Sequence, residues 1–311
     1  MNRYWLNAAG KNRPRPRVGD SREGTLNNPV LQDLVASIGD LATLPTTVVQ
    51  LLDLLKDATC SAAKVVKVME RDLAMTANVL KLSNSAFYGA RREISSVRDA
   101  LVMLGNRSVV TLAFATGMAP IMRRDLLGYG ISRERFWGHS LKAAAASAIT
   151  AERLGLGELR CEAFTAGLVH DVGMLVVDFH LVNSRESIGL GEPAFSVSAL
   201  ERQALGFDHT EAGAMLARHW GFPEVLIAPI QFHHDADFNG PHSDVVRAVT
   251  VGNILAQVVD EDLDVEANDF VRGVLSGLAF DESFLAQLRL DLSSNLEETL
   301  ARATRPAAVL V

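Results

Sequence analysis

The chain has 311 residues, 48% of them hydrophobic, and a formal net charge of −7 at pH 7. This length and composition allow a sizeable buried core and exclude a mainly disordered chain. The two cysteines, Cys60 and Cys161, are far apart and form no CxxC pattern, which favours reduced core thiols in a cytoplasmic protein over a disulfide.

The charge is unevenly distributed. Residues 1–29 hold six basic and two acidic residues, a net +4, so the remainder carries −11. An acidic body argues against a dedicated nucleic-acid surface, because phosphate backbones are bound mainly by clustered Lys and Arg. We expect residues 1–29 to be a disordered basic leader, with contact to an acidic partner as the alternative.

No secretory signal is visible, since no apolar stretch with a cleavage site follows the basic N-terminus. The apolar segment Ser108–Met122 has 15 residues, fewer than the roughly 20 that span a bilayer. The sequence therefore predicts a cytoplasmic protein without membrane insertion.

Helical periodicity dominates from residue 30 onward, which predicts an all-α fold of two packed helical subdomains. Residues 30–130 are expected to form the first. Its predicted elements are a helix Val30–Ile38, a helix opened by Leu44-Pro45, a Ser61-capped helix to Met69, an Asp72-capped helix Leu73–Leu82, a loop Asn84–Ile94, a Ser96-capped helix Val97–Leu104, a helix from Arg107 ending near Gly117, and a connection Asp125–Ser132.

Residues 131–305 are expected to form the second subdomain. Its predicted elements are helices Arg135–Leu154 and Arg160–Phe179, helices begun by capping boxes at Ser198–Glu201 and Asp208–Glu211, a helix from Pro223 to His233-His234, and helices Asp244–Val259 and Glu282–Ala303. No 20–50-residue period repeats, which argues against a solenoid.

His170 and Asp171 lie side by side inside the apolar run Ala166–Val177. Burying such polar groups is costly unless each has a partner. The pair therefore either satisfies itself and its neighbours within a helical core or holds a metal ion.

Seven of the eight histidines lie between residues 139 and 234. Neutral imidazole and carboxylate are good ligands for Fe, Mn, Zn or Ni, and a bundle can bring them together from facing helices. Scattered spacing leaves open that each histidine is a hydrogen-bonded core or helix-end residue. The candidates come from four predicted helices and are His139, His170 with Asp171, His209, and His233-His234.

Over about residues 30–300 the chain resembles the HDOD proteins, a family with the HD-related output domain of bacterial signalling. Three segments carry the resemblance: Leu44-Pro45 opening a helix, residues 72–89 (DLAMTANVLKLSNSAFYG), and residues 94–105 (ISSVRDALVMLG). The resemblance implies an all-α fold whose second part is similar to the HD hydrolase superfamily.

That likeness implies a metal set carried over residue by residue, consisting of His139, His170, Asp171, His209, His233, His234 and, in the last position, Asn253. The superfamily has an aspartate where this chain has Asn253, whose neutral amide is a weaker ligand. The HD-GYP branch has a lysine where this chain has Met174, and its Gly-Tyr-Pro loop is absent. Both departures weaken a phosphodiesterase site.

The resemblance thus favours a regulatory signalling protein that acts through protein partners, with a non-catalytic centre that could still hold a divalent transition metal. The alternative is a metal-dependent phosphohydrolase acting on a nucleotide or cyclic dinucleotide, with Asn253 tolerated. A third hypothesis, nucleic-acid binding through the leader, has only the basic residues 1–29 to support it.

Overall fold

The structure is a computed structural model that describes residues 4–6, 12–14, 43–57, 60–84, 93–184, 194–235, 237–261, 272–273 and 280–292. Helices make up 75% of this part, which confirms the all-α prediction. The described strands are the short antiparallel pair β1 (Tyr4–Leu6) and β2 (Asn12–Pro14) in the predicted leader. The predicted helix Val30–Ile38, the rest of the leader, most of the loop Asn84–Ile94 and the chain beyond residue 292 lie outside the described residues.

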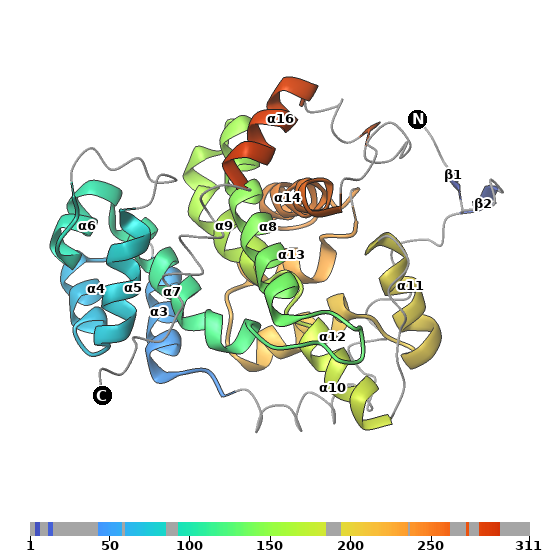
Figure 1. The fold of residues 1–311 in the computed structure, drawn as a ribbon, viewed down its shortest axis with the longest axis horizontal. Helices are drawn as coiled ribbons and strands as arrows, with labels where there is room; N and C mark the ends of the chain where they lie inside the picture. The colour runs from blue at the N-terminus through green and yellow to red at the C-terminus, as the bar shows by residue number, and fades with distance from the viewer. Residues whose placement is uncertain are drawn as a thin grey trace.

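The first group of helices gathers on one side of the molecule (Figure 1). It consists of α3 (Thr46–Lys56), α4 (Ala62–Met69), α5 (Leu73–Ser83), α6 (Val97–Leu104) and α7 (Asn106–Met122).

Local capping chemistry sets three of these helix starts, as predicted. The side chains of Ser61, Asp72 and Ser96 each accept a hydrogen bond from the backbone N–H three residues on, at 3.4, 2.9 and 3.0 Å. Each bond satisfies one of the N–H groups that a helix start leaves unpaired. Gly105, with φ +81°, ends α6 where the sequence predicted.

Helix α7 continues past Gly117 to Met122, so the predicted end near Gly117 is wrong. Gly117 serves close packing instead, because a Cβ there would lie 2.5 Å from Cγ2 of Val48 in α3. The glycine lets α3 and α7 approach each other, and Pro120 is accommodated in the last turns of the helix.

The second group is built around α8, which packs most extensively on α14 and α9 (Figure 1). Its elements are α8 (Arg133–Arg153), the 3-10 turn η2 (Gly157–Leu159), α9 (Arg160–Val169), α10 (Met174–Ser184), α11 (Ala194–Leu205), α12 (His209–His219), α13 (Glu224–Phe232), α14 (Ser243–Glu261) and α16 (Glu282–Asp291).

The single helix predicted over Arg160–Phe179 is wrong, because the structure breaks it into α9 and α10 at residues 170–173. Within the described residues, Gly157–Val182 is long and apolar enough to cross a membrane, but 72% of its most apolar window is buried inside the protein. Core helices pass the same test, so this is weak evidence for a span.

One of the two predicted capping boxes is confirmed and the other is wrong. Asp208 and Glu211 form the box that starts α12. Ser198, in contrast, lies inside α11, which begins at Ala194. The carboxylate of Glu201 is therefore not used for capping and contacts the ring of His209 instead.

The two groups share one continuous apolar core that runs from Val48 in α3 to Leu292 after α16. An ion pair between Arg107 of α7 and Glu162 of α9 joins them at the surface. The short segment between α7 and α8 is the predicted connection Asp125–Ser132, which forms a turn closed by pairing of Leu126 with Ile131.

Candidate metal centre

The break between α9 and α10 places His170 and Asp171 in the interior, where they are 0% and 8% exposed. Close backbone packing holds this break in position. A Cβ on Gly173 would lie 1.8 Å from the carbonyl oxygen of His209 and 2.8 Å from Cα of Gly213, so only glycine fits. The contact brings the His170-Asp171 loop against the first turn of α12.

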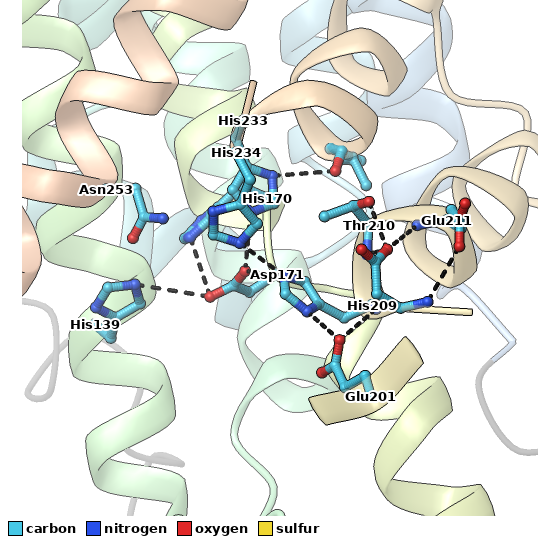
Figure 2. A network of polar contacts seen from close by, with 12 residues as sticks. His139, His170, Asp171, Glu201, His209, Thr210, Glu211, His233, His234 and Asn253 are labelled. Carbon is cyan, nitrogen blue, oxygen red and sulfur yellow. Dashed lines mark hydrogen bonds and ion pairs between the residues drawn. The ribbon is translucent and has the colours of Figure 1, made fainter. Parts of the chain in front are cut away.

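The Asp171 carboxylate lies among four imidazole rings (Figure 2). Its Oδ2 is 3.1 Å from Nε2 of His170 and 3.7 Å from Nε2 of His139. Its Oδ1 is 3.4 Å from Nε2 of His233 and 3.5 Å from Nε2 of His209. Each carboxylate oxygen thus faces its own pair of histidines.

Two groups of three side chains within the described residues have donor atoms close enough to bind one cation. Within each group these atoms all lie within 4.8 Å of one another. Three nitrogen or oxygen donors are a common protein contribution to a transition-metal site. The groups are His139, His170 and Asp171, and His209, His233 and His234.

Two of the histidines have the hydrogen bonding of metal ligands. Nδ1 of His170 lies 2.8 Å from the carbonyl oxygen of Gly167, and Nδ1 of His233 lies 3.0 Å from that of Pro229. A carbonyl only accepts, so Nδ1 carries the proton and Nε2 keeps a free lone pair. Both Nε2 atoms are buried and form no well-aligned hydrogen bond within the described part of the chain, although Asp171 oxygens lie 3.1 and 3.4 Å away. With Nδ1 as the donor in each neutral ring, the Nε2 lone pair faces a carboxylate oxygen. A metal ion would satisfy both, so these residues fit a bound cation.

The protonation states are also those of ligands. Burial would raise the pKa of Asp171, but the surrounding imidazoles, His170 first, hold it well below its usual range. Burial lowers the pKa of His233 and, more strongly, that of His234. Near neutral pH the carboxylate is therefore charged and these two rings are neutral.

His209 differs because a buried carboxylate contacts it. Burial alone would lower its pKa, but the charge and hydrogen bond of Glu201 outweigh burial and raise it to about 10. Nδ1 of His209 lies 2.7 Å from Oε2 of Glu201, and its Nε2 lies 3.1 Å from Nε2 of His234. Sequence reasoning missed Glu201 because it assigned this carboxylate to a capping box.

Asn253 lies beside the cluster on α14 (Figure 2) and is 3% exposed. Its side-chain oxygen accepts a hydrogen bond from Nε2 of Gln257 at 3.2 Å. The structure thus brings six predicted ligands into the two groups and places the seventh next to them as a neutral amide. Met174 lies at the start of α10, 7% exposed, and offers no positive charge.

The profile of the HDOD domain matches residues 41–236 of this chain. The chain is 23% identical over 238 residues to an uncharacterized protein of Treponema pallidum (strain Nichols). The matched region covers 74% of this chain and 44% of the length of that protein.

Two solved structures share the fold. A crystal structure of a protein provisionally named a phosphohydrolase from Shewanella amazonensis SB2B is 23% identical, with a TM-score of 0.65 over 90% of this chain and 100% of the other. A crystal structure of a protein from Marinobacter aquaeolei VT8, provisionally named a signal transduction protein, is 20% identical. Its TM-score is 0.62, and the match covers 92% of this chain and 67% of the other.

Proposed function

The chain belongs to the HDOD domain family, and from that premise we propose that it is a regulatory output protein of bacterial signal transduction. In this proposal its second half binds divalent transition-metal ions without hydrolysing a phosphodiester. Its first half contacts a protein partner in the cytoplasm.

The observation that carries metal binding is the position of Asp171 between two pairs of imidazoles. With the side chain only 12% exposed, its two oxygens lie 3.1–3.7 Å from four Nε2 atoms. A buried carboxylate surrounded by imidazoles is a donor set that suits Fe, Mn, Zn or Ni. A bound ion would supply positive charge and Lewis acidity at this point. His139, His170 and Asp171 would hold one ion, and His209, His233 and His234 a second.

Three features support a non-catalytic centre. His170 is 0% exposed and His233 1% exposed, which leaves little access for a phosphodiester. Asn253 gives an amide, hydrogen-bonded to Gln257, where the superfamily has a carboxylate. Met174 gives no cation to a phosphoryl oxygen, although enzymes of this chemistry depend on positive charge there.

The first half supports the proposal of a protein partner. Leu73 of α5 and Val102 of α6 are 81% and 79% exposed. A groove of about 580 Å³ lies next to Val102, lined by α4 residues such as Val66 and Lys67 and by α6 residues. Val102 lines this groove, so an apolar side chain and a hollow of the surface lie together where a partner would bind. The signal-transduction name of the Marinobacter structure agrees with such a role.

The competing function is a metal-dependent phosphohydrolase, favoured by the retention of both donor groups around Asp171. The name of the Shewanella structure points the same way. In this alternative, ions held by the two donor groups would supply Lewis acidity and lower the pKa of a water molecule.

One experiment separates the two functions. The metal content of the purified protein is measured by mass spectrometry, and hydrolysis of nucleotides and cyclic dinucleotides is assayed with added Mn²⁺ or Fe²⁺. We expect two bound ions in the wild type, loss of at least one of them in His170→Ala and Asp171→Ala, and no turnover. His219→Ala, a histidine of α12 outside both groups, is the matched control. Turnover that both site variants abolish would overturn the non-catalytic proposal, and a metal-free wild type would overturn metal binding.

A further inference from the structure

Glu201 of α11 is a fully buried carboxylate outside the two donor groups, 0% exposed. Its Oε2 accepts two hydrogen bonds from one residue, from the backbone N–H of His209 at 2.8 Å and from ring Nδ1 at 2.7 Å. Figure 2 shows it directly beneath the His209 ring, on the side away from Asp171. A buried carboxylate persists only with such compensation.

The other oxygen of Glu201 reaches the connection between the two helix groups. Oε1 accepts a hydrogen bond from the hydroxyl of Tyr129. Tyr129 is 1% exposed and lies in the turn that Leu126 and Ile131 close with two reciprocal backbone hydrogen bonds, at 2.8 and 3.0 Å. One carboxylate thus joins this turn to a ring of the metal centre.

We infer that Glu201 positions His209 as a metal ligand and, through Tyr129, links metal occupancy to the turn between the two halves of the protein. The inference rests on the metal binding proposed above. It assigns Glu201 and Tyr129 as positioning residues, since neither belongs to a donor group.

The geometry gives the physical reason. Because Nδ1 donates to Oε2, the ring presents Nε2 to the centre, 3.5 Å from Oδ1 of Asp171 and 3.1 Å from Nε2 of His234. A cation bound there would displace the Nε2 proton. Carboxylates that orient a ligating histidine contribute about 10- to 100-fold to metal affinity. Binding that fixes the His209 ring also fixes Glu201, and with it the Tyr129 hydroxyl. By linkage, a change in the turn must then alter metal affinity.

The first test compares two Glu→Gln variants near the start of α12. Glu201→Gln weakens the orienting bond, whereas Glu211→Gln changes a carboxylate that accepts from the Asp208 backbone N–H, a bond that a glutamine can also accept. Each full-length protein is titrated with Co²⁺ and followed by visible absorption and metal analysis. We expect two bound equivalents in the wild type and in Glu211→Gln. In Glu201→Gln we expect one equivalent weakened by about 10- to 100-fold.

If Glu201→Gln binds both Co²⁺ equivalents as tightly as the wild type does, this inference is overturned and the proposed function stays intact. A wild type that binds no Co²⁺ would overturn the proposed function and this inference with it.

The second test keeps the carboxylate and removes only the link to the turn. In the wild type, Co²⁺ should slow hydrogen exchange of the Leu126 and Ile131 amides, and in Tyr129→Phe this slowing should disappear. Exchange that responds to Co²⁺ equally in both proteins, or in neither, would overturn the link between the centre and the turn.

Discussion

Ser147 of α8 and Gly252 of α14 lie in backbone contact, since a Cβ on Gly252 would be 2.2 Å from Ser147 Oγ and 2.6 Å from its backbone nitrogen. Gly167 of α9 approaches the same serine from another helix, with its hypothetical Cβ 2.6 Å from Oγ. The Ser147 hydroxyl donates to the carbonyl of Ala143 at 2.6 Å, so it is satisfied within its own helix. These contacts set the spacing of the three helices that carry His139, the His170 loop and Asn253.

Gly252→Ala should therefore push α14 away from α8. Overpacking of this kind costs about 1–3 kcal/mol in the free energy of unfolding, measured by urea denaturation. Gly157→Ala is the matched control, because a Cβ there meets nothing within 4 Å, and it should change stability by less than about 0.5 kcal/mol. Equal stabilities of the two variants would show that the helices are not in contact at Gly252.

Gly173→Ala should separate the His170-Asp171 loop from α12. The added methyl would need space held by the carbonyl oxygen of His209, so we expect a loss of at least about 1–3 kcal/mol. We also expect weaker Co²⁺ binding, because Asp171 would move away from His209. Gly157→Ala again serves as control, and retention of full wild-type Co²⁺ affinity in Gly173→Ala would contradict this account.

Removal of the metal should lower thermal stability. A ligand at 100 times its Kd stabilises the folded state by about 2.7 kcal/mol, which for a chain of this size corresponds to a shift in Tm of about 4 °C. Calorimetry with and without EDTA should show this shift in the wild type. The His170→Ala variant keeps only the His209, His233 and His234 group, so it should show a smaller shift. An EDTA effect equal to that of the wild type would mean that the stabilising ion does not bind at His170.

Asn253→Asp should restore a carboxylate next to the centre. An added negative charge beside bound cations should tighten Co²⁺ binding at least about tenfold, equivalent to about 1.4 kcal/mol. Without metal the same variant should be less stable than the wild type, because it buries an uncompensated charge. Isothermal titration and urea denaturation measure the two effects. Asn253→Ala is the control, and equal affinities of the Asp and Ala variants would place residue 253 outside the metal's reach.

Local chemistry explains what could be predicted from the sequence. The helix caps Ser61, Asp72 and Ser96 can be predicted because each side chain accepts a hydrogen bond from a backbone N–H only three residues further along the chain. The six His and Asp ligands implied by the family resemblance do converge in space, because the fold brings facing helices of its second half together.

Non-local contacts explain what could not be predicted. The apolar run around His170 continues on both sides of the break, so periodicity indicated one helix, whereas the break depends on Gly173 meeting α12. The role of Glu201 was hidden for the same reason, since its partners His209 and Tyr129 come from separate segments of the chain. Such contacts leave no periodic signal in the sequence.

Because one apolar core runs without interruption from Val48 to Leu292, we expect global unfolding to expose both helix groups together. The free energy contributed by an ion in the second half would then also protect the amides of α3 to α6 against global unfolding, although neither donor group lies in those helices. A partner bound to the first half would share the same free energy.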